Sequence, residues 1–84
     1  MISPDELKIA IADTRITAMR IMQSNASVYD HEKIAEAFGI SASAVSKYAH
    51  GELPSIDTAI NIVKTEAKLN EEYIENSKKN GGLK

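Results

Sequence analysis

The segment from His31 to His50 constrains the possible fold of this chain more than any other segment. Small and apolar residues recur in it at helical spacing on both sides of one glycine, Gly39. These residues are Ile34, Ala35, Phe38, Ile40, Val45 and Tyr48. Because glycine adopts the left-handed backbone conformation at little cost, it suits the corner between two helices. The segment therefore predicts a helix-turn-helix at about residues 31–50.

The length and composition of the chain bound its class. With 84 residues, the chain is long enough for one small domain that buries a core without disulfides. Cysteine is absent, which excludes a disulfide framework and thiolate metal ligands. No apolar run approaches the roughly 18 residues that span a bilayer, and the N-terminal MISPDELK lacks the pattern of a secretory signal. We therefore expect a cytoplasmic protein that does not enter a membrane.

Residues that favour helix N-caps predict an all-α fold. Each is followed by apolar residues at helical spacing, and no segment alternates for long enough to predict a strand. The caps and the helices they begin are Ser3 (to about Gln23), Asp30 (31–38), Ser41 (42–49), Ser55 (56–68) and Asn70 (a short fifth helix with Tyr73 and Ile74). We expect one compact domain of four to five helices over residues 1–75 and a flexible tail over residues 76–84.

The first predicted helix carries apolar residues on two opposite faces. One face holds Leu7, Ala10, Ile11, Ala18, Ile21 and Met22, and the other holds Ile9, Ala12, Ile16 and Met19. One face suffices to cover the core of so small a domain, so the other either packs on a partner subunit or is enclosed by the fold. In the fourth helix we expect a single stripe to face the core, formed by Ile56, Ala59, Ile60, Val63 and Ala67.

The residues from Ile34 to Ser55 resemble the helix-turn-helix segment of the lambda-repressor and Cro-like (XRE-type) DNA-binding family. The matching residues are Ile34-Ala35, Gly39-Ile40-Ser41, Ser43, Val45-Ser46-Lys47-Tyr48, Gly51 and Pro54-Ser55. With its flanks, the resemblance covers about residues 30–69. It implies a lambda-repressor-like fold and sequence-specific binding to double-stranded DNA, usually as a homodimer that regulates transcription.

The resemblance also implies which residues contact DNA. The third predicted helix, residues 42–49, is expected to enter the major groove, which is wide enough for one α-helix. Base contacts are expected from Ser43, Ala44, Ser46 and Lys47. Phosphate contacts are expected from His31, Ser41, His50 and Ser55. These residue types suit the roles, because hydroxyls donate or accept, alanine contacts a thymine methyl, and lysine reaches guanine or a phosphate.

Motif content favours a binding protein over an enzyme. We find no glycine-rich phosphate loop, no nucleophile beside a base and no set of metal ligands, so no cofactor, metal or small-molecule ligand is expected. The net charge of −2 is low for a DNA-binding domain. Lys47 and His50 are the only basic residues from Gly39 to Gly51, and this range contains no acidic residue. Binding would therefore also use backbone amides at helix N-termini.

Two hypotheses of function follow. In the first, the chain is a prokaryotic or viral transcriptional regulator, a repressor, whose two copies read major grooves about 34 Å apart. Its copies pair through the outer stripe of helix one or through the C-terminal segment around Tyr73 and Ile74. In the second, the same scaffold is an adaptor or antitoxin-like module whose ligand is another protein. The acidic balance and the second stripe of the first helix support this alternative.

Overall fold

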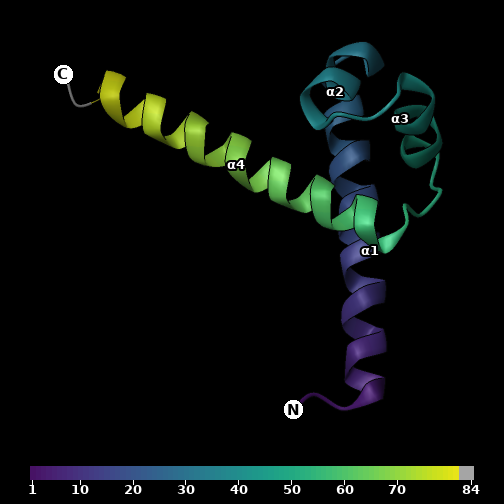
Figure 1. Ribbon diagram of the computed structural model, residues 1–84. Helices are drawn as coiled ribbons and strands as arrows, with labels where there is room; N and C mark the ends of the chain where they lie inside the picture. The colour runs from purple at the N-terminus through teal and green to yellow at the C-terminus, as the bar shows by residue number, and fades with distance from the viewer. Residues whose placement is uncertain (82–84) are drawn as a thin grey trace.

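The computed structural model describes the backbone of residues 1–81 and the side chains of residues 1–72. Within that range the chain forms four helices and no strand, which confirms the expected all-α class. The helices are α1 (Pro4–Ala26), α2 (His31–Phe38), α3 (Ala42–Ala49) and α4 (Ile56–Gly81). The first turns of α4 cross α1, and α2 and α3 pack together beside the C-terminal half of α1 (Figure 1). The bounds predicted for the second and third helices are confirmed.

Each helix begins at a predicted N-cap whose side chain accepts a hydrogen bond from a backbone N–H of the first turn. The backbone N–H of Glu6 donates to Ser3 Oγ at 3.2 Å, and that of Lys33 donates to Asp30 Oδ1 at 2.8 Å. The N–H of Ala44 donates to Ser41 Oγ at 3.0 Å, and that of Thr58 donates to Ser55 Oγ at 3.4 Å. Such local signals do not depend on the rest of the fold. They are therefore readable from the sequence.

Gly39 forms the corner between α2 and α3. Its backbone is left-handed, with φ 68° and ψ 32°. The N–H of Ile40 donates to the carbonyl of Ala35 at 3.1 Å, which closes the end of α2. Gly51, at φ 108°, follows α3 in the same way, and its N–H donates to the carbonyl of Tyr48 at 3.0 Å. The expected roles of both glycines as helix stops are confirmed.

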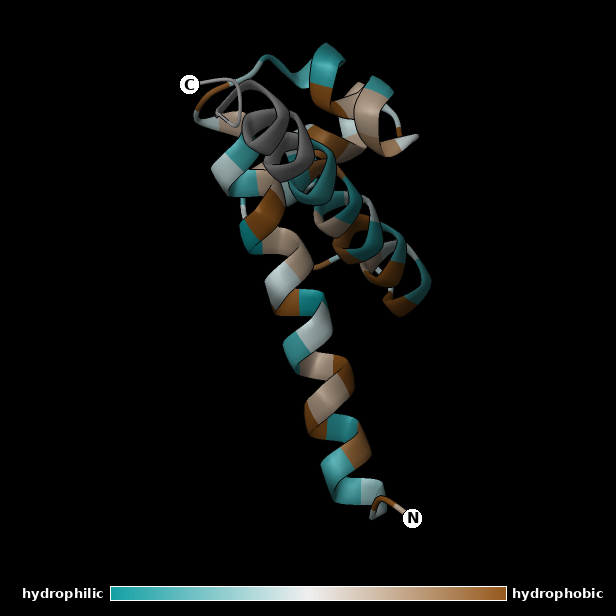
Figure 2. Cartoon of the chain, turned by 90° about the vertical axis from the view of Figure 1, so that its left-hand side faces the viewer, coloured by the Kyte–Doolittle hydropathy of each residue, from teal (hydrophilic) through white to brown (hydrophobic). Residues whose placement is uncertain are grey.

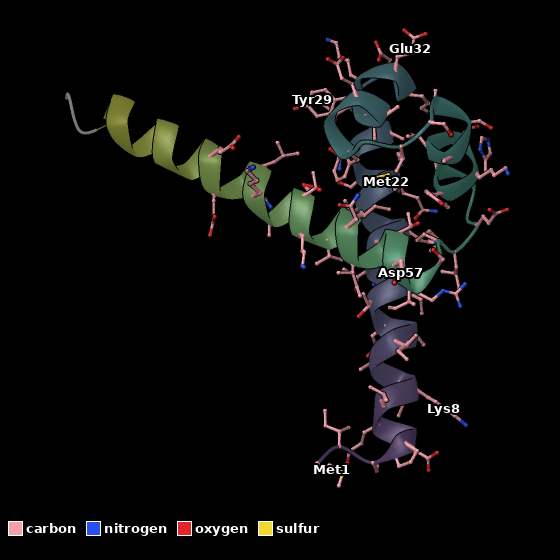
Figure 3. The ribbon with its side chains drawn as sticks, viewed as in Figure 1. Met1, Lys8, Met22, Tyr29, Glu32 and Asp57 are labelled. Carbon is pink, nitrogen blue, oxygen red and sulfur yellow. The ribbon has the colours of Figure 1, made fainter. Side chains whose placement is uncertain are left out.

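The core lies where all four helices meet. Its fully buried apolar residues are Ala18 and Met22 of α1, Ile34 and Phe38 of α2, Val45 of α3, and Ala59 and Ile62 of α4. Met22, labelled in Figure 3, is the largest of the side chains with no exposed surface. Because every helix contributes to one cluster, the position of α3 depends on the packing of the other three.

Two helix ends differ from the sequence predictions. The first helix ends at Ala26 rather than near Gln23, because Asn25 satisfies its amide within the fold. Its Nδ2 donates to the carbonyl of Ile21 at 2.9 Å and to Oε2 of Glu66 at 3.0 Å. A polar residue with such partners does not end a helix.

The separate fifth helix was also a wrong prediction, since α4 runs unbroken through Asn70. No glycine or proline occurs between Ile56 and Asn80, so nothing stops the helix there. The side chains of Tyr73 and Ile74 lie outside the described residues. Residues 76–81 belong to α4 and residues 82–84 lie outside the described range, so the flexible tail stays a prediction.

The expected core stripes are correct only in part. On α4 the buried residues are Ala59 and Ile62, whereas Ile60 of the predicted stripe is 41% exposed. The stripe is rotated because α4 packs against α2 as well as α1. On α1, Ala18 and Met22 are buried as expected, but Leu7, Ala10 and Ile11 are exposed. The N-terminal part of α1 projects beyond the other helices, with apolar residues along it (Figures 1 and 2).

Candidate nucleic-acid interface

The third helix divides into a buried side and an open side. Val45 has no exposed surface, and the half-buried Tyr48 packs against the same core. Ser43 lies two residues before Val45 and Lys47 two residues after it, so helical geometry places both on the opposite side of α3. Both side chains are exposed. This side of α3 is therefore available to a ligand.

The other two residues expected to contact bases lie at the flanks of this side. Ala44 and Ser46 are each half-buried. The carbonyl of Ser46 is also occupied, because it accepts the backbone N–H of His50 at 3.1 Å. The open side of α3 therefore consists chiefly of Ser43 and Lys47, with Ala44 and Ser46 at its edges.

Three side chains that the sequence reasoning missed hold α3 and its flanks to α1 and α4. Arg15 Nε donates to the carbonyl of Pro54 at 2.7 Å, which ties the loop after α3 to α1. The other two bonds run from Gln23 Nε2 to the carbonyl of Ala49 at 3.5 Å and from Asn61 Nδ2 to the carbonyl of Phe38 at 3.2 Å. For Arg15 a signal existed, because it lies beside Ala18 and Met22 on the apolar face of α1.

The two serines expected to contact phosphates differ in what their hydroxyls can do. Ser41 Oγ accepts the N–H of Ala44, so its proton remains available to donate to a phosphate oxygen. Ser55 Oγ accepts the N–H of Thr58 and donates to Thr58 Oγ1 at 3.1 Å. A phosphate contact from the Ser55 hydroxyl would therefore replace its bond to Thr58. Ser41 is the better placed of the two.

The two histidines lie at opposite ends of the α2–α3 unit. His31 is the half-buried first residue of α2, and His50 is exposed just after α3. His50 Nδ1 lies 2.6 Å from the carbonyl oxygen of Ser46 and donates to it in the matching tautomer. The neutral ring then presents only an acceptor at Nε2, so His50 would bind a phosphate only as the cation.

The exposed charges around this surface are acidic on balance. The exposed cations near α2 and α3 are Lys33 and Lys47, and the exposed acids are Asp30, Glu32, Glu36 and Glu52. Attraction to the phosphate backbone is consequently weak at long range. Contacts at close range, by hydroxyls and backbone amides, would have to supply a large part of any DNA affinity.

An open groove of about 390 Å³ lies between α2 and α4. Its apolar lining includes Ile34, Phe38 and Leu69, and Tyr29 also lines it. Among the side chains of residues 1–72, no cluster of histidine and carboxylate residues is placed to hold a metal ion. None of the helices in residues 1–81 has the length and apolar content needed to cross a bilayer.

Comparison with known proteins gives no relative of this chain. No model of a known protein family matches it, and neither curated proteins nor solved structures give a match.

Proposed function

We propose that this chain is a sequence-specific DNA-binding regulator of the lambda-repressor or Cro-like (XRE-type) kind, with a lambda-repressor-like fold. In this proposal α3 enters the major groove, and Ser43 and Lys47 contact base edges. Ser41 donates to a phosphate at the start of α3, while His31, His50 and Ser55 contribute further phosphate contacts. The regulator acts in the cytoplasm as a homodimer and represses transcription by occupying a promoter.

The observation that carries the proposal is the open side of α3. Ser43 and Lys47 are exposed on a helix whose other side is fixed by the buried Val45 and whose start is capped by Ser41. A helix held this way keeps its outward side chains in fixed register, which is what recognition of base edges requires. The turn at Gly39 and the bond from Arg15 to the following loop hold both ends of α3.

Lys47→Ala tests the proposal. On a duplex selected from random sequences, we expect a loss of affinity of about 5- to 150-fold, because one base contact of this kind is worth about 1–3 kcal/mol. The matched control is Lys68→Ala, which removes an exposed lysine from α4 and should leave affinity unchanged. Both variants should keep the parent's circular dichroism spectrum. Equal affinities for the two variants would remove Lys47 from the site.

A protein ligand is the second candidate function, and the groove between α2 and α4 favours it. An apolar groove can accept the apolar face of a helix from another protein. Ala37, which lines this groove, gives the discriminating variant. Under the DNA-binding proposal, Ala37→Glu leaves the affinity for the selected duplex unchanged. Two results together would favour the alternative: the parent forms a stable complex with another protein that Ala37→Glu does not form, and the parent shows no sequence-dependent DNA binding.

A further inference from the structure

The side of α1 that faces away from the core is open along the length of the helix. Its residues Ile9, Asp13, Ile16, Arg20 and Ser24 recur at spacings of three and four, so they share one face within an arc of about 80°. Ala18 and Met22 lie on the opposite side and are fully buried. Four of the five residues are exposed and Ile16 is half-buried. We refer to these five residues as the open face of α1.

Among the side chains of residues 1–72, the first turns of α1 have no packing partner. Every residue from Met1 to Asp13 is exposed, and Ile2 and Ile9 are 61% and 62% exposed. Met1 and Lys8 mark this projecting part in Figure 3. A helical segment this short is marginal in water without tertiary packing. Its exposed apolar residues indicate that another surface covers it in the assembled protein.

The charges on the open face select a second copy of this chain as that surface. Asp13 and Arg20 lie two turns apart, about 10.5 Å along the helix axis. We propose that two copies pack α1 against α1 in antiparallel orientation, with the two-fold axis crossing between Ile16 and Thr17. Each Asp13 then faces the partner's Arg20, and the pair forms twice, as a two-fold interface requires.

The same register gives partners to other exposed residues. Ile16 lies opposite the partner's Thr17 at the axis, and Ile9 lies opposite the partner's Ser24. Beyond the ends of the two helices, the chain start with Ile2 extends toward the partner's turn between α1 and α2. In that turn Val28 and Tyr29 are 72% and 53% exposed. One register therefore pairs the charges and brings together apolar residues exposed at both ends of α1.

The proposed interface is argued from α1 alone. Only the role of the dimer rests on the proposed function, since the dimer would present two α3 helices to one DNA site. The surface differs from the outer stripe expected from the sequence, which comprised Ile9, Ala12, Ile16 and Met19. Met19 lies toward the core side and is half-buried, whereas Asp13 and Arg20 are exposed. The polar residues therefore set the register and orientation, and the isoleucines supply the apolar contact.

Charge reversal tests the proposal in the absence of DNA, by sedimentation velocity of the full chain over a range of concentrations. We expect the parent to be a dimer. Arg20→Asp alone and Asp13→Arg alone should each weaken dimerisation at least tenfold, because like charges then face each other twice. Lys8→Glu is the matched control, since Lys8 is exposed on another face of α1, and it should dimerise like the parent.

Two restorations make the test specific. The double variant Asp13→Arg/Arg20→Asp should dimerise again, because both pairs re-form with exchanged signs. An equimolar mixture of the two single variants should form a heterodimer, since one carries two acids and the other two arginines at these positions. Circular dichroism of each variant should match that of the parent.

A monomeric parent, single variants that dimerise as tightly as the parent, or a double variant that stays monomeric would each overturn the proposed interface. Because no DNA is present, each of these outcomes leaves DNA binding by α3 untouched. The Lys47→Ala test on DNA can likewise fail while the dimer stands. The two proposals therefore fail separately.

Discussion

The left-handed backbone of Gly39 sets the direction in which α3 leaves α2, and Gly39→Ala tests this role. A Cβ built at Gly39 meets no atom within 4 Å, so the substitution adds conformational strain without a steric clash. An L residue in this conformation costs about 1–2 kcal/mol. The reduced freedom of the unfolded chain offsets about 0.4–1 kcal/mol of that cost. We expect a net loss of about 1 kcal/mol in the free energy of unfolding.

Urea and thermal unfolding followed by circular dichroism measure this loss. For a domain of this size, about 1 kcal/mol corresponds to a fall in Tm of about 4–8 °C. Gly39→Asn is the matched control, because asparagine tolerates the left-handed region better than alanine does. We expect its Tm to lie between those of the parent and the alanine variant.

Two results would contradict the expected role of Gly39. An alanine variant as stable as the parent would mean that the turn does not need the left-handed conformation. A loss above about 3 kcal/mol would exceed the conformational cost. It would mean that the added methyl group clashes with neighbouring atoms, whereas the structure places none within 4 Å of it.

Two further predictions concern the loop after α3 and the phosphate contacts. Arg15→Met keeps the aliphatic stem of Arg15 but removes its hydrogen bond to Pro54, so thermal unfolding should show a loss of about 1–2 kcal/mol in stability. The control Lys64→Met alters an exposed lysine of α4 and should leave stability unchanged. Equal Tm values for the two variants would show that the bond does not stabilise the fold. The slope of log K against log salt for DNA binding should be shallow, about −3 to −4.5 for ~3–5 phosphates per dimer, and a slope steeper than about −7 would show phosphate contacts beyond the residues named above.

The parts of the fold that the sequence predicted well are those decided by local chemistry. Ser3, Asp30, Ser41 and Ser55 cap their helices through bonds to residues three positions away. Gly39 adopts its backbone conformation because of its own missing Cβ. These features require no knowledge of distant contacts. The bounds of α2 and α3 followed from them.

The parts that the sequence predicted poorly depend on contacts between distant residues. Ile62 is buried because α4 packs on two helices at once, which rotates its buried face away from Ile60. Leu7 and Ile11 are exposed because α1 extends past the elements that could cover it. Helical periodicity identifies apolar faces, but it does not give the position at which one helix crosses another.

The candidate site shows the same division. The exposure of Ser43 and Lys47 follows from helical spacing once Val45 is assigned to the core. The hydrogen bond from Arg15 to Pro54 joins residues 39 positions apart, so the position of Arg15 on the apolar face of α1 did not identify its partner. The hydroxyl geometry that separates Ser41 from Ser55 likewise became visible only in the structure.

The proposed function requires the open side of α3 to read a DNA sequence. Selection of bound duplexes from a random pool tests it most directly, because the selection measures affinity and specificity together. We expect enrichment of one motif with approximate two-fold symmetry, whose half-sites lie about one helical turn of DNA apart. A bound pool with no motif enriched over the input would contradict it.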